Sequence, residues 1–306
     1  IIQYDLIVNN QGDHEILLIA DDGNTTITDT IWYTVIPPLN MLDPPAGIVD
    51  GINYINDSTV TLKLFAPEKN TVNIIGDFNN WEVNTSSFMN LSIDSSYWWI
   101  TISGLTPGQK YTYQYLVDGT IAIADPLSPL ILDPYNDGNI GSLEYPNPTP
   151  YPSGKTDGFV TVMHPGNTPY NWQNTNFIPP AKKDLIIYEL LLRDFVADHS
   201  YLTLIDTLNY LIDLGINAIE LMPPGEFENN ESWGYNPSFH MALDKYYGTP
   251  DHFKAFVDSC HNRGIAVIID IVFNHAYGQN PMVNLYWDGV NNQPAANNPW
   301  FNPICP

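Results

Sequence analysis

The stretch Gly264–His275, with the sequence GIAVIIDIVFNH, constrains the fold more than any other part of the chain. Its first residues are apolar and rich in β-branched side chains, which is typical of a strand buried on both faces in a parallel sheet. Asp270, Asn274 and His275 come late in it, and parallel α/β sheets and barrels bind their ligands at the carboxyl ends of strands. We therefore expect these three residues to lie at a site. On this pattern alone, Asp270 could equally be the partner of an ion pair.

An alternation of buried strands and amphipathic helices begins near Asp184. Residues 185–190 and 216–222 are predicted strands, each followed by a predicted helix. This βαβαβ order requires a parallel sheet with right-handed crossovers. No Gly-x-Gly-x-x-Gly turn follows these strands, so a dinucleotide site is not expected. The long connection at residues 223–248 favours a (β/α)8 barrel, although the pattern alone leaves an open doubly wound sheet as an alternative.

The chain ahead of Asp184 has the two-residue period of β-structure instead. Residues 1–37 hold enough alternating segments for about three strands and are predicted to be the tail of an immunoglobulin-like β domain. Residues 45–140 are predicted to form a second β-sandwich module, in which Asp118-Gly119 marks a hairpin turn. Residues 141–183, rich in Pro, Gly, Asn and Tyr, are predicted to connect it to the barrel part at 184–306. The expected fold is therefore multi-domain, with all-β immunoglobulin-like sandwiches followed by an incomplete TIM (β/α)8 barrel.

The charge balance narrows the classes of partner. The chain has 34 Asp and Glu against 10 Lys and Arg, a formal net charge of −24, which disfavours nucleic acid and anionic membrane surfaces. No apolar run approaches membrane-spanning length, and two cysteines make no disulfide framework. Aromatic residues reach 13% while charged residues are only 14%. This balance suits stacking on neutral, hydroxyl-rich ligands, although much of the aromatic content could fill sandwich cores.

Several motifs occur in a fixed order along the second half of the chain, and one lies in the sandwich. The sandwich motif is Gly76-Asp77-Phe78-Asn79-Asn80-Trp81; the others are Ile187-Tyr188-Glu189-Leu190 with Arg193-Asp194-Phe195, Leu221-Met222-Pro223, Trp233-Gly234-Tyr235-Asn236-Pro237, Tyr246-Tyr247-Gly248-Thr249 and Asp270-x-x-x-Asn274-His275. Together they resemble the α-amylase superfamily, glycoside hydrolase family 13, with the sandwich module that precedes the barrel in starch- and glycogen-acting enzymes. The resemblance covers roughly residues 45–306.

The resemblance implies substrate contacts. Tyr235 is expected to stack under the glucose ring at the cleaved position, and His275 to donate a hydrogen bond to a hydroxyl of that sugar. Asn236 is a further candidate contact in the same motif. In the sandwich, Trp81 is a candidate to stack on a sugar ring, with a place in the core as the alternative.

The resemblance also implies supporting residues. Asp270 is expected to orient an arginine from the next barrel strand, and Asn274 to ligate a structural calcium ion (Ca²⁺), while no organic cofactor is expected. Retaining hydrolysis needs two carboxyl groups about 5 Å apart, which the family takes from its fourth and fifth barrel strands. Only three barrel strands are expected here. No residue of this chain is therefore expected to be catalytic, and the nucleophile and general acid are expected beyond its C-terminus.

These implications predict part of a glycoside hydrolase that acts on α-1,4-glucan (starch, glycogen or maltooligosaccharides) by a retaining mechanism. The chain opens without Met and stops without a closing element, so we expect a piece of a longer protein that is inactive by itself. Two alternatives are a non-catalytic glucan-binding protein with a degenerate barrel, and a glucan branching or transglycosylating enzyme. An extracellular or cell-surface location is expected because the polymer is too large to import.

Overall fold

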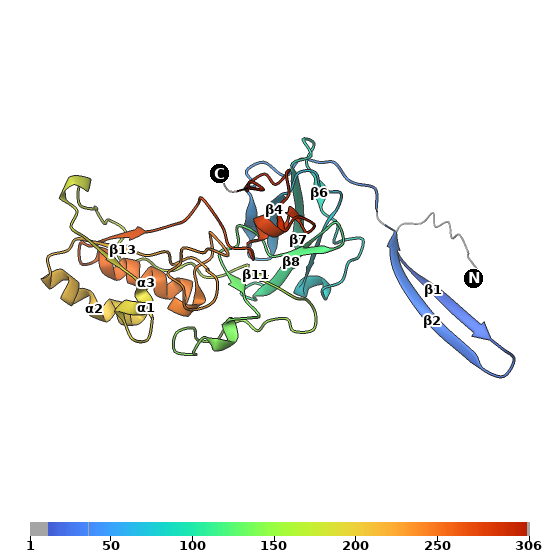
Figure 1. Cartoon of the computed structure of the whole chain (residues 1–306), viewed down its shortest axis with the longest axis horizontal. Coiled ribbons are helices and arrows are strands. Elements are labelled where there is room, and N and C mark those ends of the chain that lie inside the picture. The colour runs from blue at the N-terminus through green and yellow to red at the C-terminus, as the bar shows by residue number, and fades with distance from the viewer. Residues whose placement is uncertain (1–11, 36, 305–306) are drawn as a thin grey trace.

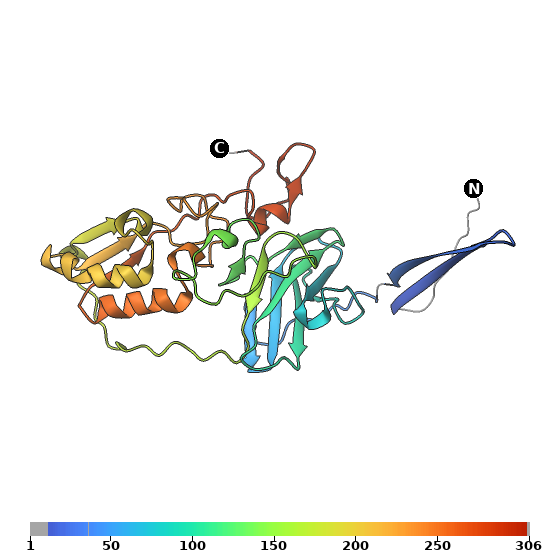
Figure 2. The ribbon, with the colours of Figure 1, turned by 90° about the horizontal axis from the view of Figure 1, so that it is seen from below.

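The computed structural model describes residues 12–35 and 37–304. Figure 1 shows three parts along the longest axis: a β-hairpin, a β-sandwich and an α/β part. In both views the hairpin projects away from the other two parts (Figures 1 and 2). Among the helices of the described residues, none combines the length and the apolar character needed to cross a membrane.

The hairpin pairs β1 (Gly12–Asp21) with β2 (Thr26–Val35) in an antiparallel register. Asp22 closes its turn, because its Oδ1 accepts hydrogen bonds from the backbone N–H groups of Asn24 and Thr25 at 2.9 and 2.8 Å. Leu18 and Trp32 remain 60% and 70% exposed, so this hairpin buries little apolar surface. Where an immunoglobulin-like tail of about three strands is predicted, the structure thus describes two strands; the first alternating segment, residues 4–8, lies outside the described residues.

Two antiparallel sheets form the sandwich, in the orders β3-β4-β7-β6 and β10-β11-β8-β5, with β9 added on β8. Side chains from both sheets meet in a core around Trp98, Tyr113 and Tyr115, each at most 1% exposed. The hairpin predicted at Asp118-Gly119 is confirmed, since β8 and β9 pair across a turn of residues 118–120, in which Asp118 and Gly119 both have positive φ. The strands are β3 (Gly51–Asn56), β4 (Thr59–Phe65), β5 (Val72–Gly76), β6 (Asn90–Leu91), β7 (Tyr97–Ser103), β8 (Tyr111–Val117), β9 (Ile121–Ile123), β10 (Ile131–Leu132) and β11 (Val160–Met163).

The sandwich extends beyond residue 140, where the sequence analysis placed its end. Strand β11 pairs with both β8 and β10, and all four of its residues are buried. The prediction that residues 141–183 only connect two domains is therefore wrong at this strand. A four-residue strand between Gly- and Pro-rich turns is too short to show a clear two-residue period.

The α/β part contains a parallel sheet in the order β12-β13-β14, which confirms the predicted βαβαβ order. Helices α2 and α3 pack against one face of it around Tyr201, Leu208 and Phe256, which are fully buried. Each helix begins at a side-chain cap, Ser200 for α2 and Thr249 for α3. The elements are β12 (Ile187–Leu190), α1 (Leu192–Phe195), α2 (Tyr201–Asp213), β13 (Ala218–Leu221), α3 (Pro250–His261) and β14 (Ala266–Ile269), with short 3-10 turns η1 (Asp77–Asn79), η2 (Asp137–Asn139), η3 (Lys182–Asp184) and η4 (Lys245–Tyr247).

After β14 the chain returns to the sandwich, where it forms α4 (Pro281–Asn284) and a small hairpin of β15 (Trp287–Asp288) with β16 (Gln293–Pro294). Leu285 and Tyr286 are 0% and 3% exposed and belong to the sandwich core. The Tyr286 hydroxyl donates to the Pro67 carbonyl, and Lys69 Nζ lies 4.2 Å from the centroid of the Tyr286 ring. Residues 281–300, which we name the return segment, thereby join the α/β part to the sandwich.

Candidate functional site

Three of the predicted site residues meet at the carboxyl ends of β13 and β14. Tyr235 lies in the long loop between β13 and α3, while Asp270 and His275 follow β14. The Tyr235 hydroxyl donates to Asp270 Oδ2 at 2.6 Å, and His275 Nε2 lies 2.6 Å from the Tyr235 carbonyl oxygen. Neighbouring parallel strands end at the same edge of a sheet, which is why residues distant in sequence meet here.

The Tyr235 ring combines exposure with a fixed hydroxyl. Its side chain is 38% exposed, so part of the ring is accessible to a ligand. The hydrogen bond to Asp270, with smaller effects of burial and of the Asp270 charge, raises the pKa of Tyr235 to about 12. The hydroxyl therefore stays protonated at neutral pH and keeps donating to the carboxylate.

The loop around Tyr235 is held by its neighbours. Gly234 has φ +90°, and a Cβ there would lie 2.3 Å from the Pro223 carbonyl oxygen, so only glycine fits. The Asn236 amide donates to Glu228 Oε2 at 3.1 Å, and its Oδ1 accepts from the Ser232 hydroxyl. The side chain of Asn236 thus stabilises the loop, and its contact with substrate stays a prediction.

His275 is engaged on both ring nitrogens. Because a carbonyl oxygen only accepts, Nε2 is the donor in the bond to Tyr235. Nδ1 lies 3.1 Å from the side-chain amide oxygen of Asn274, Oδ1, which also only accepts. For His275 to donate to a sugar hydroxyl through Nε2, the hydroxyl must replace the Tyr235 carbonyl.

The calcium expectation rests on Asn274, which is exposed. Calcium takes six to eight oxygen ligands, and the described residues contain no group of three or more His, Cys, Asp or Glu side chains placed to hold a metal ion. Among the described residues, Asn274 is therefore not accompanied by such a cluster of side chains. Its role as a ligand stays a prediction.

Two glutamates that the sequence analysis did not select share the sheet face of Asp270. Glu189 pairs with Glu220 of β13, which in turn pairs with Ile268 of β14. Asp270 comes two residues after Ile268, and side chains two residues apart along a strand point to the same side. The charges of both glutamates contribute to the raised pKa of Tyr235. Both glutamates occupy the third position of a four-residue strand, Ile187–Leu190 and Ala218–Leu221, and this repeat is visible in the sequence. The carboxyl edge of the sheet is therefore acidic beside an exposed aromatic ring.

A buried cluster of charges lies at the base of the Tyr235 loop. Lys245 Nζ lies 3.0 and 2.9 Å from the two carboxylate oxygens of Glu226 and 3.2 Å from Asp137 Oδ1. Burial alone lowers the pKa of Lys245, but the attraction of its acidic neighbours outweighs burial and raises it. Burial raises the pKa of Asp244, beside it, to about 7. Asp137 lies between the sandwich strands β10 and β11, so the cluster also ties the sandwich to this loop.

The sandwich motif that contains Trp81 builds a turn. A Cβ on Gly76 would lie 2.4 Å from the Thr112 carbonyl oxygen. Asp77 accepts from the Trp81 ring N–H at 3.0 Å and from the Thr112 backbone N–H at 2.6 Å. Trp81 is half-buried and packs against the cluster of Leu132, Val160 and Val162. This packing accounts for much of the ring, and stacking of Trp81 on a sugar stays a prediction.

Comparison with known proteins finds family matches for both the sandwich and the α/β part. Residues 201–303 match the family model of the alpha amylase catalytic domain, and residues 51–136 match carbohydrate-binding module 48, the isoamylase N-terminal domain. Among solved structures, a protein described as an alpha amylase from Salmonella typhimurium is 25% identical with a TM-score of 0.62, covering 84% of this chain and 38% of that chain. The group B Streptococcus pullulanase SAP in complex with maltotetraose shares the fold at 20% identity, with a TM-score of 0.58 over 76% of this chain and 34% of its own.

Curated relatives agree with this placement. The malto-oligosyltrehalose trehalohydrolase of Saccharolobus solfataricus is 28% identical over 222 residues, covering 72% of this chain and 34% of the relative. The 1,4-alpha-glucan branching enzyme GlgB of Pseudoalteromonas atlantica is 32% identical over 233 residues, covering 69% of this chain and 28% of the relative. The chain thus spans about a third of the length of the curated relatives it matches. The predicted fold class is confirmed, and the chain belongs to the α-amylase superfamily, with a carbohydrate-binding module 48 sandwich followed by part of an alpha amylase catalytic domain.

Proposed function

We propose that the protein acts on α-1,4-glucan as a retaining glycosidase of the α-amylase type. The observation that carries this proposal is the cluster of Tyr235, Asp270 and His275 at the carboxyl ends of β13 and β14. An exposed aromatic ring beside a carboxylate and an imidazole suits a sugar, whose C–H face packs on the ring while its hydroxyls form hydrogen bonds.

The acidic edge of the sheet supports the same chemistry. The transition state of glycoside hydrolysis resembles an oxocarbenium ion and carries positive charge on the sugar ring. Asp270, Glu189 and Glu220 create a negative potential where this charge develops. We assign the nucleophile and the general acid to barrel strands later than β14, with their carboxyl groups about 5 Å apart.

A branching activity is the second candidate, and the relatives favour it. Several GlgB branching enzymes match at about the same level, including those of Pseudoalteromonas atlantica and Paramagnetospirillum magneticum, both 32% identical. Branching uses the same glycosyl-enzyme step as hydrolysis, and differs because a glucan hydroxyl takes the place of water. A non-catalytic glucan-binding protein is the third candidate.

Product analysis of the full-length protein on amylose tests the proposal. Hydrolysis with retention releases new reducing ends whose first NMR signals are those of the α-anomer. Branching produces α-1,6 signals without a matching rise in reducing ends. Binding without either product would contradict both catalytic candidates and support the binding protein.

Calcium at Asn274 and an extracellular or cell-surface location are further proposals that rest on the resemblance alone. For calcium, the melting temperature of the full-length protein before and after chelation is the direct readout. Stabilisation by calcium in the parent protein and its loss in Asn274→Ala would support the assignment. An equal response of both proteins would contradict it.

A further inference from the structure

His240 connects the candidate site to the part of the chain that packs on the sandwich. It lies in the loop between β13 and α3 and is half-buried. Its ring stacks on that of Phe273, with 6.0 Å between the centroids and 19° between the planes. The ring also forms a hydrogen bond with the backbone of His275, and its Nδ1 lies 3.4 Å from Asn280 Nδ2. His240 thus contacts both a predicted substrate residue and the start of the return segment.

The side chain of Asn280 determines which nitrogen of His240 carries the hydrogen. Asn280 is 1% exposed, and its Oδ1 accepts from the Met282 backbone N–H at 2.8 Å as the N-cap of α4. Nδ2 is therefore the atom that faces His240, and an amide nitrogen only donates. Nδ1 of His240 must accept, which leaves the hydrogen on Nε2. Burial lowers the pKa of His240, so the ring keeps this neutral form at neutral pH.

The Nε2–H group of His240 is thus free to donate to the His275 backbone, where only the carbonyl oxygen accepts. A bond to an acceptor favours the charged form of a histidine, and the bond to His275 acts on His240 in this direction. Beside it, the Tyr277 backbone N–H donates to the Pro237 carbonyl at 2.8 Å. His275 Nε2 lies 2.6 Å from the Tyr235 carbonyl oxygen. The segment after β14 is therefore joined to the Tyr235 loop through both the side chain and the backbone of His275.

The backbone around His240 is anchored on the sandwich. Phe239 is 1% exposed and packs against Phe159, with 5.3 Å between the ring centroids. Ala242 is 2% exposed and belongs to the same apolar cluster, which includes Ile131 of β10. His240 lies between these two buried residues, so its backbone has little freedom to move.

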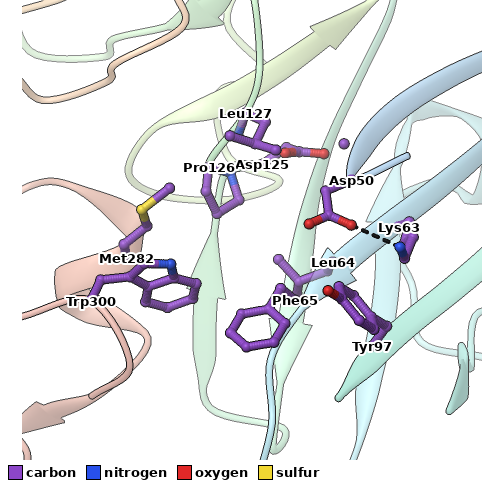
Figure 3. Close-up of a pocket in the computed structure, with 11 residues that line it drawn as sticks. Asp50, Lys63, Leu64, Phe65, Tyr97, Asp125, Pro126, Leu127, Met282 and Trp300 are labelled. Atoms are coloured by element: carbon purple, nitrogen blue, oxygen red, sulfur yellow. Dashed lines mark hydrogen bonds and ion pairs between the residues drawn. The ribbon is translucent and has the colours of Figure 1, made fainter. Parts of the chain in front are cut away.

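Asn280 is anchored at the seam between the sandwich and the return segment. It directly precedes α4, and Figure 3 shows Met282 of α4 and Trp300 facing the sandwich residue Phe65. The rings of Phe65 and Trp300 lie 5.6 Å apart between centroids. Both contacts that orient the His240 ring thus come from parts of the chain that the sandwich holds in place.

We propose that His240 is a positioning residue, whose Nε2–H group fixes the backbone of His275 so that the His275 side chain meets the substrate in one orientation. His240 acts through His275 and does not itself touch the sugar. This inference rests on the proposed function, in which His275 contacts the substrate. It also gives the sandwich a part in ordering the site, because the sandwich anchors both His240 and Asn280.

Two substitutions separate the two nitrogens of His240. In His240→Gln the side-chain amide nitrogen can replace Nε2 and donate to the His275 carbonyl, whereas His240→Asn keeps an acceptor near the place of Nδ1 and loses the Nε2 donor. In the full-length protein with amylose, we expect kcat/KM to fall about tenfold in His240→Asn, the loss that corresponds to one hydrogen bond. His240→Gln should stay within about twofold of the parent protein.

His164→Asn is the matched control. His164 follows β11, and its Nε2 lies 2.9 Å from the Gly108 carbonyl oxygen, so this variant loses a bond of the same kind within the sandwich. It should turn over amylose as the parent protein does. A second comparison uses His275→Ala, in which the added change His240→Asn should lower kcat/KM no further, because the residue through which His240 acts is gone.

Hydrogen exchange of residues 275–280 provides a readout that needs no turnover. We expect exchange to be about fivefold faster in His240→Asn than in His240→Gln, because only the glutamine retains the bond to the His275 carbonyl.

The positioning role is overturned if the two His240 variants have equal kcat/KM and equal exchange, or if His240→Asn lowers kcat/KM as much without the His275 side chain as with it. Amylose turnover by the parent protein with parent-like values for both His240 variants defeats only the positioning role. A parent protein without turnover, whose exchange still separates the two variants, supports the bond from His240 and defeats only the proposed function.

Discussion

Removing the buried cation at the base of the Tyr235 loop should cost more stability than removing any surface charge. Lys245 is 4% exposed and bonds both carboxylate oxygens of Glu226, which is equally buried. In Lys245→Met, Glu226 is left as an uncompensated buried charge, and breaking such a pair costs about 3–5 kcal/mol. Glu226 can escape by taking up a proton, which becomes harder as the pH rises. The loss should therefore be greater at pH 8 than at pH 5.

Equilibrium urea unfolding of the full-length protein measures this loss, with hydrogen exchange of residues 223–248 as the local readout. Lys254→Met is the matched control, because Lys254 pairs with Asp251 at 3.1 Å on the surface, where a pair contributes about 0–1 kcal/mol. The double variant Lys245→Met with Glu226→Gln removes both charges and should recover about half of the loss or more.

Unfolding of Lys245→Met at the same urea concentration as Lys254→Met would contradict an unpaired buried charge on Glu226. A double variant no more stable than Lys245→Met would contradict it too, since the cost would then come from packing and not from an unpaired charge.

Three further predictions concern the loop and the seam. Gly234→Ala places a Cβ against Pro223 and should lower kcat/KM on amylose about tenfold or more, because Tyr235 is displaced. The control Gly278→Ala should leave kcat/KM unchanged, since its Cβ meets no atom within 4 Å. The pKa of Asp244 is raised to about 7, so the protonated carboxyl favours the folded state. The stability that this pKa shift contributes is complete below pH 4 and is lost as the pH rises to 7. Melting curves of Asp244→Asn should lack this part of the pH dependence; an unchanged slope would contradict the assignment. Tyr286→Ala should lower the free energy of unfolding by about 3–5 kcal/mol and expose the return segment to limited proteolysis. Tyr286→Phe loses only one hydrogen bond and should lower it by about 1 kcal/mol. Equal cleavage of the two variants would contradict this prediction.

Much of the fold follows from local pattern. The two-residue period and the Asp118-Gly119 turn predict β8 and β9, and buried strands alternating with amphipathic helices predict the parallel order of β12, β13 and β14. Strand β11 was missed because its four residues carry too little pattern. The contact between Tyr286 and Pro67 joins residues 219 positions apart, and no local period encodes such a pairing.

The candidate site, too, could be predicted from the sequence only in part. The meeting of Tyr235, Asp270 and His275 follows from the rule that parallel strands end at a common edge. The burial of Lys245 does not follow from any such rule, because the sequence shows only a lysine within a polar loop. Burial depends on how Glu226 and the neighbouring loops fold over it, and local sequence does not determine this.

A crystal structure of the full-length protein with a bound maltooligosaccharide would test the roles of Tyr235 and His275 directly. We predict a glucose ring stacked on Tyr235, with one of its hydroxyls within about 3.2 Å of His275 Nε2 in place of the Tyr235 carbonyl. A saccharide bound elsewhere in the barrel part, with Tyr235 still bonded to Asp270 and its ring in contact with no sugar, would contradict substrate binding by Tyr235 and His275.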